Sequence, residues 1–226
     1  MLNITNAAKK PTLIIGIILS ILLPFLAIYS SLLFKDSGLS KEAQFYISRF
    51  TIWISLLLLF LYSFKIEKQP FLHWKETEYS FSFLTTAILK TFLKLFLAVV
   101  LTGLLFMLLK MNSQSTVLNK ALGILKKSYV LLFFTCVTAG ITEELIFRGY
   151  LLPRLELLVK NQKLAILISS SVFGFMHFGY GTLVNIIGPI VIGVVLALQY
   201  EKYRNIKIVI ICHFLWDLFL LMLKTK

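Results

Sequence analysis

Charged residues are scarce in this chain: Asp, Glu, Lys and Arg make up 15% of its 226 residues, and 58% of the residues are hydrophobic. Soluble domains carry about 25% charged and about 45–50% apolar residues. The apolar excess is gathered in long runs, which excludes a soluble globular domain. The sequence therefore predicts an integral membrane protein that lies in a lipid bilayer.

Acidic residues are scarcer than basic ones, with 10 Asp and Glu against 23 Lys and Arg and a formal net charge of +13. The basic residues fall in short segments between the apolar runs. In such segments Lys and Arg set the topology of a membrane protein and contact anionic lipid headgroups. This placement argues against a nucleic-acid partner.

Cysteine is rare too, and both residues, Cys136 and Cys212, lie inside apolar runs. Neither has CxxC or zinc-finger spacing, so no disulfide framework is predicted and both are expected to pack as small hydrophobic side chains. A signal-peptide cleavage site of the A-x-A type is also missing after the first apolar run. That run is longer than a signal h-region of about 7–15 residues, so it is predicted to be an uncleaved first span.

The apolar runs predict an all-α, polytopic bundle of transmembrane helices, with about seven spans and a range of six to eight. Three regions are expected: N-terminal transmembrane helices over 1–110, a polar or amphipathic connector over 111–128 and a core with the candidate site over 129–226. The expected spans cover about residues 12–34, 45–64, 81–109, a fourth from about 129, 164–178, 183–200 and 206–223.

Three residues with long side chains are expected at the membrane surface. Arg49 is expected to snorkel from near the end of the second span. Trp74, in the loop 65–80, is expected to be an interfacial aromatic anchor. Arg154 begins an amphipathic segment, 154–163, that is expected to lie at the surface.

The run 135–153 places two adjacent carboxylates and an arginine inside a span. Such charges cost roughly 2.5 kcal/mol or more each at a helix centre, so they indicate a functional site. Neighbours on a helix point about 100° apart, so Glu143 and Glu144 cannot both face one cavity. Glu144 and Arg148 share a face, so Arg148 is expected to neutralise Glu144 and leave Glu143 free to act. Phe147, one turn from Glu143, could wall the site.

Two later spans carry histidines. Phe173 and His177 are four residues apart, so the phenyl ring can stack beside the imidazole and fix its rotamer. His213 and Asp217 have the same spacing, so the carboxylate can hold one ring nitrogen and set the tautomer. Small residues at 139–140 would let another helix approach closely.

Each of these groups alone could serve helix packing, but six of them on three spans favour one shared site. A buried glutamate can activate water as a general base, and histidines can polarise a carbonyl or stabilise an oxyanion. Alternatively Glu143, His177 and His213 could bind a divalent metal such as zinc, as two histidines and a carboxylate do in thermolysin-type hydrolases. No H-E-x-x-H is present, so the spacing leaves both alternatives open.

The chain over about 135–220 resembles the CPBP family, also called the Abi family. That family groups CAAX prenyl endopeptidases with bacteriocin-processing and bacteriocin-immunity membrane proteins. The resemblance rests on three motifs in order, Glu143-Glu144-x-x-x-Arg148, Phe173-x-x-x-His177 and His213-x-x-x-Asp217.

The resemblance implies an intramembrane endopeptidase of the type II CAAX class, built as an all-helical multi-span bundle. By position, Glu143 would be the base that activates water, with Glu144 and Arg148 as its supporting pair. His177 would be the second catalytic group, and His213 with the residue four later would stabilise the oxyanion. Family members have been described both as metalloproteases and as glutamate-dependent enzymes, so the resemblance leaves a metal open.

Many family members carry asparagine where this chain has Asp217. An ionised carboxylate cannot donate a hydrogen bond, so Asp217 is better suited to orient His213 or to bind a metal.

The resemblance to the short bacterial members also implies a bacterial plasma membrane and, as substrate, a bacteriocin or pheromone precursor or a membrane-anchored regulator. The rival hypothesis is a non-catalytic bacteriocin self-immunity or regulatory protein. A transporter that uses the polar cluster as a proton relay is a third, although no inverted repeat is visible.

Overall fold

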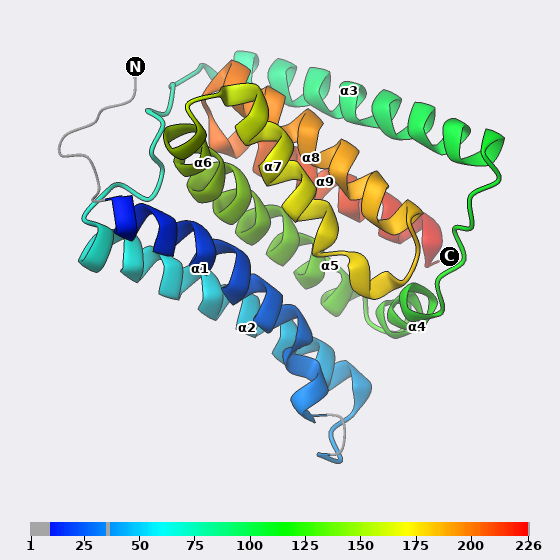
Figure 1. The fold of residues 1–226 in the computed structure, drawn as a ribbon. Coiled ribbons are helices and arrows are strands. Elements are labelled where there is room, and N and C mark those ends of the chain that lie inside the picture. The colour runs from blue at the N-terminus through cyan, green and yellow to red at the C-terminus, as the bar shows by residue number, and fades with distance from the viewer. Residues whose placement is uncertain (1–9, 35–36, 226) are drawn as a thin grey trace.

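The long apolar runs fold into helices throughout the part of the chain that the structure describes, residues 10–34 and 37–225 of a computed structural model (Figure 1). Residues 1–9, 35–36 and 226, which belong to the predicted regions 1–110 and 129–226, lie outside the described residues. The described elements are α1 (Lys10–Tyr29), η1 (Ser30–Phe34), α2 (Lys41–Tyr62), η2 (Ser63–Glu67), α3 (Phe81–Leu108), α4 (Thr116–Leu125), α5 (Tyr129–Thr138), η3 (Ala139–Glu143), η4 (Leu145–Leu151), α6 (Leu152–Val159), α7 (Gln162–Phe175), η5 (Phe178–Tyr180), α8 (Val184–Tyr203) and α9 (Ile206–Lys224).

Short polar side chains fix where several helices begin. The Ser128 hydroxyl accepts a hydrogen bond from the Leu131 amide at 3.2 Å, and the Asn161 side chain accepts one from the Leu164 amide at 3.0 Å. Such N-caps satisfy amides that have no partner within the helix. They set the first residues of α5 and α7, and with them the register of two helices that carry site residues.

Six helices in the described residues are long and apolar enough to cross a membrane, which confirms the predicted integral membrane protein and agrees with six to eight spans. α7, the predicted fifth of seven spans, has only 14 residues. At 1.5 Å per residue it is about 21 Å long, less than the ~30 Å hydrocarbon layer. It therefore does not count as a span by itself. The six cover 10–29, 41–67, 81–108, 129–159, 184–203 and 206–224.

The helices form one bundle around the long helix that runs from α5 to α6 (Figure 1). α1 and α2 lie side by side as a hairpin against one side of it, while α7, α8 and α9 pack on the other. α3 runs along the outer edge against α8 and α9, and α4 lies at the end of the bundle beside η5. The predicted connector thus contains a helix, α4.

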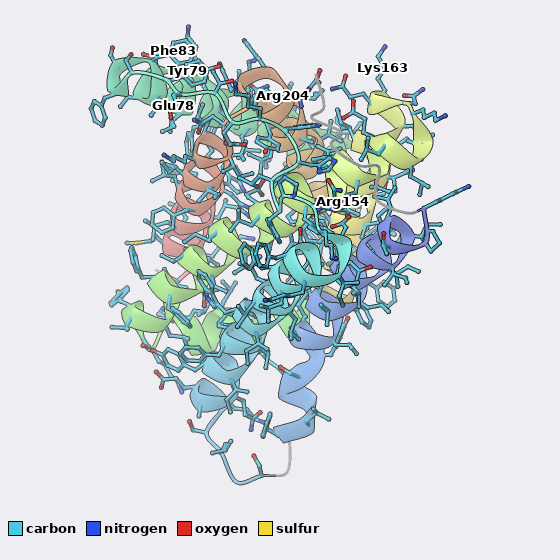
Figure 2. The ribbon with its side chains drawn as sticks, turned by 90° about the vertical axis from the view of Figure 1, so that its left-hand side faces the viewer. Glu78, Tyr79, Phe83, Arg154, Lys163 and Arg204 are labelled. Atoms are coloured by element: carbon cyan, nitrogen blue, oxygen red, sulfur yellow. The ribbon has the colours of Figure 1, made fainter. Side chains whose placement is uncertain are left out.

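The loop 68–80 packs onto the bundle, so the prediction that Trp74 anchors the membrane interface is wrong. Trp74 is only 4% exposed, and its indole nitrogen donates to a Glu156 carboxylate oxygen at 3.1 Å. Its ring lies against Tyr200, and the Arg204 guanidinium lies 3.6 Å from its centroid. Figure 2 shows Arg204 beside this loop at the end of the bundle. The indole buries its apolar area and still finds an acceptor, which is why the loop folds inward.

Arg154 is fully buried, so the prediction that it lies at the surface is also wrong (Figure 2). Its Nε and Nη2 donate to the Glu67 carboxylate over 2.7–3.0 Å. Its Nη atoms also donate to the carbonyl oxygens of Pro70, Phe71 and Tyr150. A guanidinium tolerates burial only when its N–H groups are satisfied in this way. The pair therefore ties η2 and the following loop to α6.

Gly174 lets α7 touch the backbone of α8. A methyl group there would lie 2.6 Å from the Ile186 carbonyl oxygen and 3.1 Å from the Ile190 amide nitrogen. We expect Gly174→Ala to lower the free energy of unfolding by about 1–3 kcal/mol, because backbone cannot move aside. Thermal melting in detergent measures this. Gly188→Ala is the matched control on α8, since a methyl group there meets no atom within 4 Å; equal melting of the two variants would contradict the prediction.

Candidate active site

The two adjacent glutamates lie where the central helix widens. Its α-helical ends, α5 and α6, are joined through two π-helical segments, η3 and η4, and Glu144 lies between these segments. π-helical turns are rare and often occur at functional sites. Gly140 in η3 would place a methyl group 3.0 Å from the Phe214 amide nitrogen and 3.1 Å from the Ile210 carbonyl oxygen. The close approach of another helix at 139–140 is thus present, and the helix is α9.

Glu144 is completely buried and is held by two donors. One carboxylate oxygen accepts from Arg148 Nη1 at 2.9 Å and from His213 Nδ1 at 2.7 Å. Arg148 also donates to the Gly193 carbonyl oxygen and lies over the Phe173 ring. The expected pair of Glu144 and Arg148 is present. Glu144 also binds His213, a contact that the sequence does not predict.

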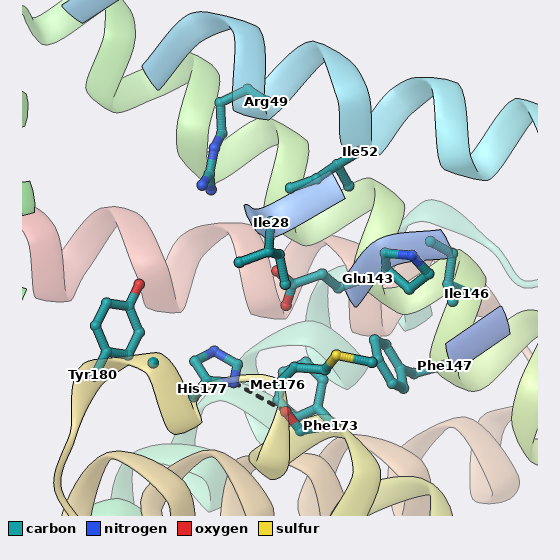
Figure 3. A pocket seen from close by; sticks show the side chains of 12 residues that line it. Ile28, Arg49, Ile52, Glu143, Ile146, Phe147, Phe173, Met176, His177 and Tyr180 are labelled. Atoms are coloured by element: carbon teal, nitrogen blue, oxygen red, sulfur yellow. Dashed lines mark hydrogen bonds between the residues drawn. The ribbon is translucent and has the colours of Figure 1, made fainter. Parts of the chain in front are cut away.

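The side chain of Glu143 points away from that of Glu144 and into a cavity. Its side chain is 21% exposed, and the nearest ring nitrogen, His213 Nε2, is 3.9 Å from its carboxylate. That distance is too long for a hydrogen bond. The different directions of Glu143 and Glu144 agree with the helix geometry predicted from the sequence, and they leave Glu143 facing the cavity (Figure 3).

His213 is oriented by a residue other than the expected one. The sequence predicts that Asp217 holds a ring nitrogen, but the Asp217 carboxylate is 3.6 Å from Nε2, beyond hydrogen-bond distance. Glu144 holds Nδ1 instead, because α9 packs onto η3 and brings His213 over the central helix. Since a carboxylate accepts the hydrogen bond, Nδ1 carries a proton and Nε2 faces Glu143 and Asp217.

His177 lies just after α7, with its ring edge-on to Phe173 at 5.2 Å between centroids. Its Nδ1 is 3.0 Å from the Phe173 carbonyl oxygen (Figure 3). A carbonyl oxygen only accepts, so Nδ1 carries a proton and Nε2 of the neutral ring is an acceptor. The expected contact of Phe173 with His177 is present. Phe147 packs edge-on against Phe173 and lines the same cavity, as expected of a wall.

Two adjoining cavities meet at these side chains. One of about 80 Å³ lies against α1 and α2, and the other of about 220 Å³ reaches α4, α8 and α9. His213 and Asp217 line the second. Glu144 and Arg148 line neither and lie buried behind Glu143. The residues common to both cavities are Arg49, Glu143, Phe173, His177 and Tyr180.

The predicted metal ligands Glu143, His177 and His213 share a cavity, but they do not form a metal site as placed. Among residues 10–34 and 37–225, no three His, Cys, Asp or Glu side chains lie close enough together to hold an ion. Both Nδ1 atoms already donate to oxygen acceptors, so only the Nε2 atoms could bind a metal. As placed in the described residues, these side chains do not converge on one ion, and no step below passes through a metal.

Arg49 is the site residue that the sequence misassigned. It was expected to snorkel to the headgroups, but its guanidinium points from α2 into the space that Glu143, His177 and Tyr180 surround (Figure 3). Trp53, one turn further along α2, donates its indole N–H to Thr138 at 3.0 Å. Arg49 and Trp53 share a helix face, so this bond turns Arg49 inward. Two polar side chains four apart on an apolar helix are the signal that could have revealed it.

Comparisons with known proteins agree with the motifs. Residues 125–219 match the family described as type II CAAX prenyl endopeptidase Rce1-like. UPF0177 protein YvdC of Lactococcus lactis subsp. lactis (strain IL1403) is 30% identical over 169 residues, which are 74% of this chain. The chain covers 60% of that relative's length. No solved structure matches the chain.

The matched range contains all three motifs, so the resemblance to the CAAX endopeptidase family is confirmed over 125–219. α1, α2, α3 and all of α4 except its last residue lie outside this range. Arg49 therefore belongs to the part of the cavity that the family match does not cover.

Proposed function

We propose, because residues 125–219 match the Rce1-like endopeptidase family, that this integral membrane protein hydrolyses a peptide bond in a membrane-associated peptide or protein. The observation that supports this best is that a partly exposed Glu143 lines the cavity of about 220 Å³ together with His177 and His213. A glutamate beside imidazoles in a cavity that admits water can activate that water. Because the similar protein YvdC is bacterial, a bacterial plasma membrane stays the proposed location.

Glu143 is the proposed general base. It takes one proton from a water molecule as the water oxygen attacks the carbonyl carbon of the peptide bond. The protonated Glu143 then gives this proton to the leaving amide nitrogen as the carbon–nitrogen bond breaks. His177 Nε2 is an acceptor in the neutral ring, so it suits the second hydrogen of the attacking water.

The imidazole ring of His213 is proposed to be held in one orientation beside the cavity. Its Nδ1–H donates to Glu144, which Arg148 holds in turn, so Nε2 is directed at the cavity. Asp217, 3.6 Å from Nε2, stabilises positive charge on this ring through the electrostatic attraction of its carboxylate.

Comparative peptidomics tests the proposal. Membranes from cells that produce the wild type are compared with membranes that hold an equal amount of Glu143→Gln. We expect pairs of new peptide ends that depend on the wild type. If the two membranes give the same peptides, the protease proposal fails and a binding or immunity role becomes the better reading.

Metal removal is a separate prediction. Since no three ligand side chains converge in the described part of the chain, we expect protein dialysed against a chelator to cleave peptide at an unchanged rate. The measurement compares initial rates before and after dialysis, with added zinc as a further arm. Loss of cleavage that zinc restores would show that the side chains rearrange around a metal, contrary to the proposal.

A further inference from the structure

Arg49 is a cation within a membrane-spanning helix, and the proposed reaction does not yet assign it a role. It lies on α2 and lines both cavities together with Glu143 and His177. A charged side chain in a spanning helix is costly, and such residues are retained where they do a task. The hydrogen bond from Trp53 to Thr138 on the same face of α2 fixes the direction of Arg49 toward the central helix.

The other two arginines that point into the bundle are satisfied by protein groups. Arg148 pairs with Glu144 at 2.9 Å, and Arg154 pairs with Glu67 at 2.7 Å. Both also donate to backbone carbonyl oxygens. These contacts explain why both are buried, and they leave few donors for a ligand.

Arg49 differs from both. Within the described chain its Nε donates to the Ser48 hydroxyl at 3.4 Å, and its guanidinium lies 4.9 Å from the Phe45 ring centroid. Neither of its Nη groups has a hydrogen-bond partner among these residues, and no ion pair joins Arg49 to Glu143 or Asp217. Up to four N–H donors thus face the cavity without a partner in the described part of the chain.

The gap between Arg49 and the carboxylates fits a particular kind of group. The carboxylates of Glu143 and Asp217 face the cavity from η3 and α9, and the guanidinium faces it from α2. A ligand between them needs an acceptor on the side of Arg49 and an atom open to water attack on the side of Glu143. A neutral peptide bond has both, in its carbonyl oxygen and carbonyl carbon, whereas a carboxylate would meet repulsion from two like charges.

We propose that Arg49 binds the carbonyl oxygen of the peptide bond that is cleaved and stabilises the negative charge that develops on it. This rests on the proposed function. As the water oxygen bonds to the carbonyl carbon, the π electrons of the C=O bond move to oxygen, which accepts N–H bonds from Arg49. When the C=O bond re-forms, the C–N bond breaks and the amine takes the proton from Glu143. Arg49 is thus a catalytic residue from outside the family-matched range.

Neighbouring side chains are less suited than Arg49 to stabilise the negative charge on the carbonyl oxygen. An ionised Asp217 has no proton to donate, and His213 Nε2 lies between two carboxylates at 3.6 and 3.9 Å. The guanidinium stays protonated and donates in a fixed planar fork. Donors aimed at a developing oxyanion act strongly in a site of low dielectric constant, and the removal of one typically lowers kcat by about 10²–10³-fold.

The test is a kinetic comparison of Arg49→Gln, Arg49→Lys and the wild type in detergent. The substrate is a fluorogenic peptide that contains the cleavage site found by peptidomics, made with a C-terminal carboxylate and with a carboxamide. We expect Arg49→Gln to lower kcat about 100-fold or more for both peptides, with KM within about threefold of the wild type. Arg49→Lys should recover part of kcat, because an ammonium is charged but lacks the fork.

Lys41→Gln is the matched control, since it removes an exposed positive charge from the same helix outside both cavities. It should cleave like the wild type. A higher KM at unchanged kcat, restricted to the carboxylate peptide, would instead make Arg49 a binding site for a substrate carboxylate and overturn the proposal. So would a loss of kcat that is matched by a lower melting temperature in both Arg49 variants.

The two proposals fail in different ways. If the wild type cleaves but Arg49→Gln cleaves equally fast, the role of Arg49 is wrong and the protease remains. If the wild type and Glu143→Gln give the same peptides, the proposed function is wrong, and the proposed role of Arg49 is wrong with it.

Discussion

Glu143→Gln is expected to lower peptide cleavage by about 10²–10⁴-fold while the protein remains in the membrane at wild-type abundance. The reason is chemical, because glutamine has nearly the same shape but cannot take a proton from water. In the described structure the Glu143 carboxylate accepts no hydrogen bond, so the exchange breaks no contact. Initial cleavage rates and the amount of protein in the membrane are the two quantities to measure.

Two further glutamates make this result specific. Glu201→Gln removes a carboxylate from α8 at a position that lines neither cavity, so cleavage should stay at the wild-type rate. Glu144→Gln should lower both cleavage and stability, because Glu144 accepts from Arg148 and His213 in a fully buried position. If Glu143→Gln loses abundance in the same way, its role is structural and the assignment of the base is wrong.

The same variant separates the rival functions. A non-catalytic immunity or regulatory protein should keep its protective or regulatory effect with Glu143→Gln and with His177→Ala, since neither side chain would perform chemistry. A transporter that relays protons through the cluster would lose solute flux in proteoliposomes instead. Cleavage, protection and flux are therefore three readouts of one substitution.

Contacts between residues four apart in the sequence could be predicted from the sequence. Glu144 with Arg148 and Phe173 with His177 are each four residues apart, and helix geometry brings such pairs together whatever the rest of the fold does. Apolar length also predicts the spans, apart from the run 164–178, where α7 has only 14 residues and is too short to span the membrane by itself.

Contacts between helices could not be predicted. His213 and Glu144 are 69 residues apart, and Arg154 and Glu67 are 87 apart. Whether such residues meet depends on the rotation and depth of each helix, and helix periodicity determines neither of these. The amphipathic pattern of 154–163 therefore predicts a surface position for Arg154, although the fold surrounds it with acceptors.

The π-helical turns of η3 and η4 could not be predicted from the sequence either. Periodicity predicts an ordinary helix through 139–151, on which two adjacent glutamates diverge by about 100°. The structure keeps that divergence and widens the helix there, at the place where α9 touches Gly140. A tighter or looser turn changes little in the hydrophobic pattern, so the sequence carries no clear signal for it.

Arg154→Met is expected to lower the free energy of unfolding by about 3–5 kcal/mol, because it leaves the buried Glu67 carboxylate without its counter-charge. Three carbonyl oxygens lose donors as well. Thermal melting in detergent measures the loss without any substrate, so the prediction stands independently of the proposed function. Arg204→Met is the control, since Arg204 stacks on Trp74 but forms no ion pair in the described residues.

A second substitution tells charge from packing. Glu67→Leu together with Arg154→Met removes both charges, and apolar replacements of a buried ion pair are often tolerated or even stabilising. The double variant should therefore melt above Arg154→Met alone, although the orphaned carbonyl oxygens keep it below the wild type. If the double variant melts lower than the single one, the loss comes from packing around α6, and the buried charge is not what makes Arg154 necessary.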